Sequence, residues 1–218
     1  MKRKIAAVIF DMDGVLTDTE PVHFAATNAV LAGEGKAMTW EQYEPFIGTA
    51  EPAMWKFIDE VIGLTGDHGA FSELYNTAAL ESLTAGVEVL PGAREAVAMV
   101  RERGLKAGLA SSSRAAWVEA TLKSAGLTGQ FDAIVAGDML PPGRGKPEPD
   151  IFRLTAERLG VAPGECVVLE DSPRGITAAR AAGMLAVGVR SKYKLDLSEA
   201  DDVIDGIADF DIDRYLEP

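Results

Sequence analysis

The stretch "LKAGLASSSRAAWVEATLKSAGLTGQFDAIVA" (residues 105–136) decides the fold of this chain. It opens with a short apolar run, continues with helical periodicity over 113–126, and closes with a second short apolar run at 131–136. Two buried strands joined through a helix are typical of a parallel sheet, because parallel neighbours need a crossover connection between them.

The same alternation continues outward on both sides of this stretch. We expect further buried strands at 4–10, 166–170 and 185–189, with an edge strand at 201–207. Further helices are expected at 92–104, 148–160 and 172–183, and a glycine stops each of them. Strands and helices in alternation predict an α/β fold, with a Rossmann-like parallel sheet covered by helices on both faces.

Residues 18–86 interrupt this alternation, because they show helical patterns and no convincing strand. They predict an all-helical cap domain inserted after the first strand, which leaves residues 1–17 plus 87–218 as the core. Ligands of open parallel sheets bind beyond the carboxyl ends of the strands, where this insertion emerges. We therefore expect the cap to act as a lid over the site.

Composition limits the possible partners of the chain. It has 218 residues, 47% of them hydrophobic, and no apolar run reaches the ~20 residues of a membrane span. With no signal-peptide pattern at the start, we expect a cytoplasmic protein without a membrane partner. The net charge of −13 argues against nucleic acid. A small anionic substrate would need a local positive centre, such as a metal. The sequence does not indicate an oligomeric state.

Polar residues follow the predicted strands at the points where the strands end. Asp11 and Asp13 come after the first strand, in "IAAVIFDMDGVLTDTE" (residues 5–20). Residues two apart in an extended chain project to the same side, so both carboxylates could converge on one cation or one phosphorus. A lone motif of this kind more often only begins a loop. The other strand ends supply Ser111, Ser112, Ser113, Lys146, Glu170 and Asp171.

Each of these residues also has a purely structural interpretation. Ser113 could be only the N-cap of the next helix, and Ser172 with Pro173 forms a good N-cap and first-turn pair. The "GRGK" before Pro147 is not a nucleotide-binding loop, because Leu140 stands where that motif needs glycine. All of these strand ends would meet at one edge of the sheet, which favours a shared function.

The segments "DMDGVLTDTE", "LASSSR", "GKPEPDIF" and "LEDSPRGI", in this order, resemble the haloacid dehalogenase superfamily hydrolases of the capped, β-phosphoglucomutase-like type. The resemblance covers essentially the whole chain. It implies a Rossmann-like core, an inserted helical cap, a required Mg²⁺ and phosphoryl transfer through an aspartyl-phosphate.

This resemblance assigns roles to the acidic residues. Asp11 would be the nucleophile, because a carboxylate is ionised at pH 7 without a helping base. Asp13 would protonate the leaving alkoxide and later deprotonate the attacking water. Asp11, the backbone carbonyl of Asp13 and Asp171 would hold Mg²⁺, with Glu170 in or near its coordination shell.

Further residues would contact the phosphoryl group or the rest of the substrate. Ser111 would donate a hydrogen bond to a phosphoryl oxygen, and Lys146 would place a fixed positive charge beside it. Backbone N–H groups of Met12 and Gly14 would complete the cradle. The remaining candidates for substrate contact are Ser112, Arg114, His23 and Glu51.

The cap indicates which substrate is turned over. Residues 18–86 hold eleven Asp or Glu, two lysines and no arginine. In β-phosphoglucomutases a cap arginine grips a second phosphate, whereas this chain has Glu51 at that place, in "FIGTAEP". We therefore expect hydrolysis of a small phosphomonoester, a sugar phosphate by family resemblance, in preference to a mutase reaction. His23 could either reach the reaction centre or pack the inner face of its helix.

Two other functions are less favoured. A phosphonatase would need a Schiff-base lysine, and the neighbours of Lys56 do not single it out for that role. A receiver-type signalling domain also combines acidic residues, a hydroxyl and a lysine on a parallel sheet. Such a domain has no lid and lacks a second acid two residues from its phosphorylated aspartate.

Overall fold

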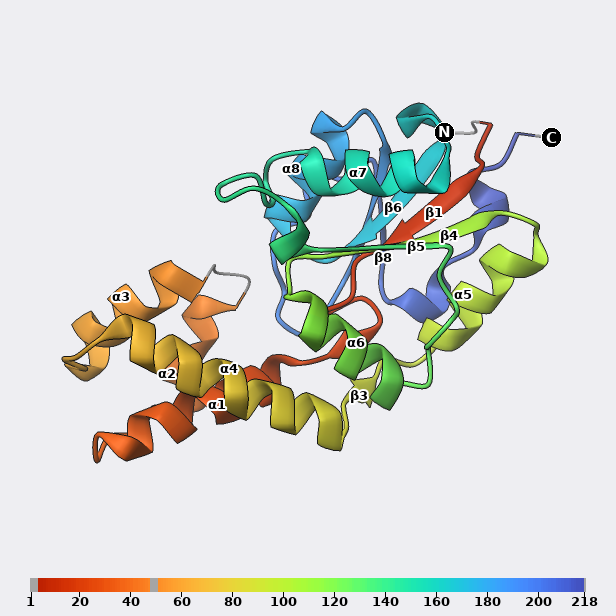
Figure 1. Cartoon of the computed structure of the whole chain (residues 1–218). Coiled ribbons are helices and arrows are strands. Elements are labelled where there is room, and N and C mark those ends of the chain that lie inside the picture. Colours follow the sequence, from red (N-terminus) through yellow and green to blue (C-terminus); the bar gives the residue numbers. More distant parts are fainter. Residues whose placement is uncertain (1–3, 48–50, 218) are drawn as a thin grey trace.

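A six-stranded parallel sheet forms the centre of the computed structural model, which describes residues 4–47 and 51–217 (Figure 1). Its strand order is β5-β4-β1-β6-β7-β8. The strands are β1 (Ala7–Phe10), β4 (Lys106–Ser111), β5 (Ala133–Ala136), β6 (Cys166–Glu170), β7 (Leu185–Val189) and β8 (Asp202–Ile204). The expected parallel sheet is confirmed, and the C-terminal strand lies at its edge as predicted. β8 ends at Ile204, before Gly206 and a 3-10 turn (Ile207–Asp209).

Helices cover both faces of this sheet. They are α5 (Ala93–Glu102) and α6 (Ala115–Ser124) on one face, and α7 (Asp150–Leu159) and α8 (Pro173–Ala181) on the other. The side chains of β1 alternate between the two apolar layers, with Val8 and Phe10 in one and Ala7 and Ile9 in the other. A strand buried on both faces explains the continuous apolar run before Asp11.

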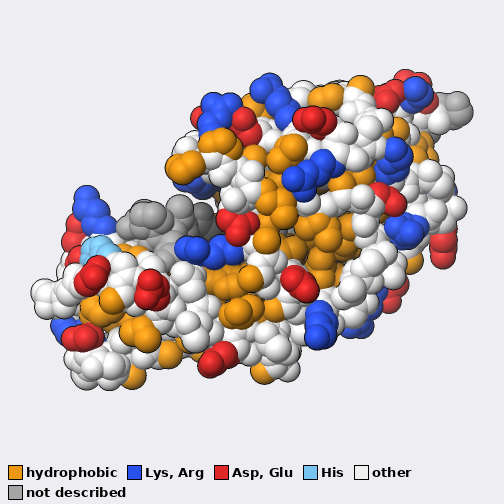
Figure 2. Space-filling view, viewed as in Figure 1, with side chains coloured by type: hydrophobic (Ala, Val, Ile, Leu, Met, Phe, Trp, Pro, Cys, Tyr) orange, Lys and Arg blue, Asp and Glu red, His pale blue; other side chains and the backbone are white. Residues whose placement is uncertain are grey.

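In the described residues of the cap, four α-helices lie between β2 (Thr17–Asp18) and β3 (Glu88–Val89): α1 (Glu20–Gly33), α2 (Trp40–Tyr43), α3 (Glu51–Ile62) and α4 (His68–Ala85). They share an apolar cluster of their own, in which Trp55 and Ile58 are fully buried. Trp117 of the core helix α6 belongs to the same cluster, so the cap packs directly on α6. The inserted helical cap is therefore confirmed, and it stands out from the core on one side of the molecule (Figure 2).

Two local features differ from the sequence expectation. The helical pattern over residues 39–48 gives only one α-turn, α2, followed by a 3-10 turn at Glu44–Phe46. Pro45 accounts for this, because it has no N–H with which to continue the α-helical hydrogen bonds. The other feature is the antiparallel pairing of β2 with β3, which joins the two connections between core and cap.

The buried carboxylate of Asp18 anchors this hinge to the core. It accepts a hydrogen bond from Tyr193 Oη at 2.7 Å and forms an ion pair with Lys192, both from the loop after β7. The described part of the chain contains no helix that combines the length and the apolar character needed to cross a bilayer.

Candidate active site

Three buried carboxylates gather where β1 and β6 end. These strands are neighbours, and Phe10 is in register with Leu169, so Asp11 and Glu170 emerge side by side. Asp11, Glu170 and Asp171 each offer an oxygen atom within 4.8 Å of the others, and their exposed fractions are only 5%, 1% and 7%. The structure thus brings together carboxylates that are far apart in the sequence.

The ammonium of Lys146 lies within this cluster. Lys146 comes from the loop before α7, and its Nζ is 2.5 Å from Asp11 Oδ1 and 3.4 Å from Glu170 Oε2. Nζ also donates to the carbonyl oxygen of Ala110 at 3.3 Å. Three ionised carboxylates and one ammonium leave a net charge of −2. A divalent cation would neutralise that charge.

The pKa values of these groups reflect their burial. Burial raises the pKa of Asp11, the Lys146 ammonium opposes this rise, and the charges of Glu170 and Asp13 add to it. Burial likewise raises the pKa of Asp171, and so do Glu170 and Asp11. Burial alone would lower the pKa of Lys146, but the surrounding carboxylates raise it above its ordinary value. A bound cation would favour the ionised form of both aspartates.

Two glycines make room for the carboxylates. A Cβ on Gly14, whose φ is +84°, would lie 2.0 Å from Asp171 Oδ2. A Cβ on Gly175 in α8 would lie 2.0 Å from Glu170 Oε2. Glu170 is further fixed by Ser172, which donates from its Oγ to Oε1 at 2.8 Å and also N-caps α8. Oxygen donors held in this way fit Mg²⁺, a hard cation with strict geometry.

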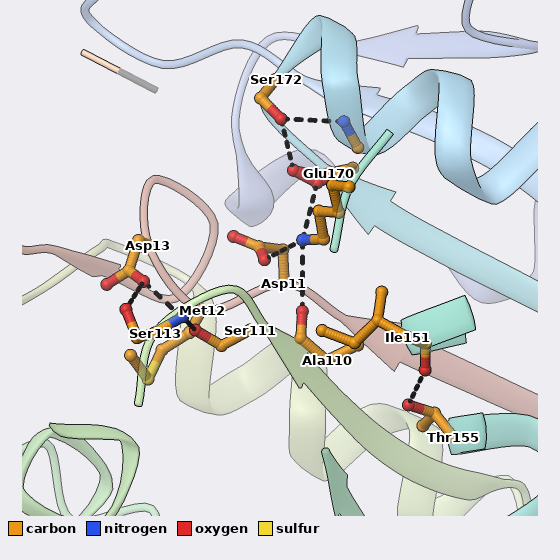
Figure 3. Close-up of polar contacts among 12 residues, drawn as sticks. Asp11, Met12, Asp13, Ala110, Ser111, Ser113, Ile151, Thr155, Glu170 and Ser172 are labelled. Carbon is orange, nitrogen blue, oxygen red and sulfur yellow. Dashed lines mark hydrogen bonds and ion pairs between the residues drawn. The ribbon is translucent and has the colours of Figure 1, made fainter. Parts of the chain in front are cut away.

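Asp13 lies apart from this cluster, although only one residue separates it from Asp11. Its Oδ1 accepts a hydrogen bond from Thr19 Oγ1 at 2.7 Å, and its Oδ2 accepts from Ser113 Oγ at 3.0 Å and from Ser111 Oγ at 3.3 Å. Figure 3 shows Asp13 beside the two serines and away from Glu170. The two aspartates therefore have different environments, one among charges and one among hydroxyl groups.

Ser113 was expected either to share in the site at the strand end or only to N-cap the next helix, and the structure shows that it is not the N-cap. Arg114 occupies the N-cap position of α6, and the N–H of Ala115 donates to Asp138 Oδ1 at 3.0 Å. Ser113 instead orients Asp13, as does Thr19, which the sequence did not single out. Both residues lie within motifs that were singled out, "LASSSR" and "DMDGVLTDTE".

The loop between β1 and β2 is held together by its own backbone. The carbonyl oxygen of the buried Met12 accepts from the N–H groups of Leu16 and Thr17, at 2.9 and 3.1 Å. The N–H of Gly14 donates to Thr17 O at 2.7 Å, so it is engaged within the loop. In the structure Gly14 provides space for Asp171 and no free N–H for a phosphoryl group. The predicted N–H contact from Met12 stays a prediction.

The remaining predicted contact residues lie on the core surface or in the cap. Ser112 and Arg114 are exposed beside Ser111. His23 of α1 lies between the domains, with Nδ1 2.9 Å from Tyr75 Oη and its ring centroid 5.3 Å from that of Trp117. The ring therefore packs at the cap–core contact, and the predicted contact of His23 with substrate stays a prediction.

The two cap lysines, Lys36 and Lys56, and Glu51 lie on the cap helices or directly beside them. Lys36 donates to the carbonyl oxygens of Ile62 and Gly63, at 3.0 and 2.5 Å, and so joins the segment after α1 to the end of α3. Lys56 is exposed on α3. Glu51 is the first residue of α3, but its side chain lies outside the described part of the structure. Its predicted place in the substrate pocket stays a prediction.

Comparison with known proteins agrees with this geometry. Residues 5–183 match the family described as haloacid dehalogenase-like hydrolase. The chain belongs to this family. The fructose-1-phosphate phosphatase YqaB of Escherichia coli is 39% identical to this haloacid dehalogenase-like hydrolase, over 87% of the chain and 99% of the relative. The predicted enzyme class, a phosphoric monoester hydrolase of the haloacid dehalogenase type, is confirmed.

Two further matches show how widely the hydrolase is related. The chloroplastic protein Suppressor of Quenching 1 of Arabidopsis thaliana is 39% identical over 90% of the chain, and the match spans only 18% of that longer protein. The crystal structure of β-phosphoglucomutase from Clostridium difficile superposes with a TM-score of 0.81 and 27% identity, covering 96% of this chain and 95% of that one. This superposition includes nearly all of the core and the cap.

Proposed function

We propose that the chain hydrolyses a small phosphomonoester of the sugar-phosphate class, with Mg²⁺ and through an aspartyl-phosphate on Asp11. The observation that carries this proposal is the buried cluster of Asp11, Glu170 and Asp171 around Lys146, with Asp13 held separately by hydroxyl groups. A nucleophile among compensating charges and a second carboxylate outside them are the two groups that this reaction needs.

The first half of the reaction would use both aspartates. An oxygen of Asp11 forms a bond to phosphorus while the bond from phosphorus to the leaving alkoxide breaks, and Asp13 gives its proton to that alkoxide. Lys146 stabilises negative charge on the phosphoryl oxygens. Bound to Asp11, Glu170 and Asp171, Mg²⁺ would supply positive charge that offsets the repulsion between Asp11 and the phosphate dianion.

The second half returns the enzyme to its starting state. A water molecule gives a proton to Asp13 and forms a bond to phosphorus, and the bond between phosphorus and Asp11 breaks to release inorganic phosphate. Thr19 and Ser113 keep Asp13 oriented through both halves, because each donates a hydrogen bond to its carboxylate. Ser111, whose contact with Asp13 is longer at 3.3 Å, would turn its hydroxyl to a phosphoryl oxygen when the substrate is bound.

The cap supports hydrolysis in preference to mutase chemistry. A mutase must hold a second phosphate, and residues 18–86 offer no arginine for this task. Glu51 stands where the mutases have that arginine, and its carboxylate would repel a second phosphate. The fructose-1-phosphate phosphatase relative supports a sugar phosphate as substrate. Supplying β-glucose 1-phosphate with a bisphosphate primer tests the alternative, since efficient formation of glucose 6-phosphate would establish the mutase reaction.

A screen of phosphorylated metabolites, with and without Mg²⁺, tests the proposed function directly. We expect release of inorganic phosphate only with the cation, and acid quenching should trap a phosphorylated protein. Asp11→Asn should abolish both signals with the thermal unfolding curve retained. Asp209→Asn is the matched control, because Asp209 is an exposed aspartate outside the site. Undiminished turnover by Asp11→Asn would refute the assignment of the nucleophile.

A further inference from the structure

The carboxylate of Glu20 is a cap group beside the site that the proposed mechanism does not use. Glu20 is the first residue of α1 and directly follows Thr19, whose hydroxyl donates to Asp13. Burial, and after it the charges of Asp13 and Asp18, raise the pKa of Glu20 to about 7, while the hydrogen bond from Tyr43 opposes the rise. Glu20 is therefore near Asp13, the group that would protonate the leaving alcohol.

One oxygen of this carboxylate is fixed and the other is open. Oε2 accepts a hydrogen bond from Tyr43 Oη at 2.8 Å. Tyr43 is only 4% exposed, and the rings of Phe24 and Trp40 pack against it with centroids 5.3 and 5.5 Å away. Within residues 4–47 and 51–217, Oε1 has no hydrogen-bond partner, and Glu20 as a whole is half-buried. The cap thus presents one oriented acceptor atom.

The surroundings of Glu20 favour a neutral partner. The charge of Lys192 reaches Glu20, but its ammonium already pairs with Asp18. The ring of Tyr193 lies 6.2 Å from that of Trp40, so aromatic side chains of core and cap meet beside this acceptor. An aromatic wall with one oriented acceptor suits a hydroxyl group on a carbon chain. A carboxylate or a second phosphate there would be repelled by Glu20.

We infer that Glu20 is a specificity-determining residue, whose Oε1 accepts a hydrogen bond from a hydroxyl group of the leaving alcohol. The substrate is then the phosphate ester of a neutral polyhydroxy compound, and phosphorylated acids and bisphosphates are disfavoured. This inference rests on the proposed function and narrows its substrate class.

Two pairs of matched substrates test the inference. Sorbitol 6-phosphate differs from 6-phosphogluconate, and glycerol 3-phosphate from 3-phosphoglycerate, only in carrying a hydroxymethyl group in place of a carboxylate. The assays are run at about pH 8.5, above the pKa of Glu20. In at least one pair the wild-type kcat/KM should favour the neutral ester by about 10- to 100-fold, the range expected for a hydrogen bond to a charged group. Glu20→Gln should reduce that ratio roughly tenfold.

Control variants separate this role from a structural one. Glu34→Gln, at the exposed far end of α1, removes the same charge and should leave the ratio unchanged. Tyr43→Phe removes the donor that orients Glu20, and it should shift the ratio in the same direction even where Glu20→Gln folds poorly. Hydrolysis of p-nitrophenyl phosphate reports the core chemistry independently of this contact. If both variants keep their p-nitrophenyl phosphate turnover and the ratio between neutral and acidic esters does not change, the inference about Glu20 is wrong and the proposed function still stands. No turnover of any ester by the wild type would overturn the proposed function.

Discussion

Replacing Gly14 by alanine should damage the site far more than it damages the fold. Gly14 has a φ of +84°, a conformation that costs an L-residue roughly 1–2 kcal/mol. The added Cβ would also lie 2.0 Å from Asp171 Oδ2, where an ordinary contact is 3.4–4 Å. The Asp171 carboxylate must therefore move by about 1.5 Å, which the strict octahedral geometry of Mg²⁺ does not tolerate.

Gly35→Ala is the control that separates the displacement of the Asp171 carboxylate in Gly14→Ala from the backbone cost of placing alanine at a positive φ. Gly35 has a φ of +66° at the end of α1, and nothing lies within 4 Å of a Cβ built there. Both variants carry a similar conformational cost, so urea unfolding should give both a loss of roughly 1–2 kcal/mol relative to wild type. Only Gly14→Ala should also lose turnover, by about 100-fold in kcat, which is typical of a 1 Å misplacement in a catalytic site.

The assay combines urea unfolding with phosphate release at graded Mg²⁺ concentrations. Gly14→Ala should need a much higher Mg²⁺ concentration for half-maximal turnover, whereas Gly35→Ala should follow the wild type. Equal kcat and equal Mg²⁺ response in the two variants would show that Asp171 does not need its observed position. The proposed site would then be wrong in its most specific feature.

The remaining predictions concern the charges of the cluster. In Mg²⁺-free buffer the melting temperature should fall as the pH rises above about 4. The pKa values of Asp11 and Asp171 are raised above 3.8 in the folded chain. The folded chain therefore keeps protons that the unfolded chain releases, and its stability decreases as the pH rises. The increase in melting temperature on adding Mg²⁺ should consequently grow with pH, and a pH-independent increase would contradict it. Lys146→Met should cost about 3–5 kcal/mol in urea unfolding, since it leaves buried carboxylates uncompensated. Lys4→Met, which breaks an exposed ion pair with Glu165, should be nearly neutral, and equal effects of the two variants would argue against the buried pair.

The fold was largely predictable because its signals are local. Each core strand is a short apolar run, and each core helix has an apolar face and stops at or just before a glycine. The hinge pair was not predictable for the opposite reason. β2 and β3 have two residues each, too few to show a period, and their pairing depends on a contact between Thr17 and Val89 that only the folded cap creates.

The clustering of the acidic residues was predictable, and the directions of the side chains were less so. Parallel strands deliver their carboxyl ends to one edge, so the approach of Asp11 to Asp171 follows from topology. The direction of each side chain does not follow from it. Asp13 turns toward Ser113 because a hydroxyl donor is available there, and Gly175 is required by the bulk of Glu170. Such contacts arise from packing between segments, which no spacing in the sequence encodes.

The segment from Asp11 to Glu20 couples the chemistry to the choice of substrate. Asp11 belongs to the buried cluster, Thr19 binds the carboxylate of Asp13, and Glu20 opens the first cap helix. Between them, Asp18 is tied to the loop after β7. Thr19 directly precedes α1, so a movement of α1 that carries Thr19 with it would displace the hydroxyl that orients Asp13. A leaving alcohol that binds Glu20 would hold α1, and with it the proton donor, in the position the reaction needs, so the fit of the substrate should affect kcat as well as KM.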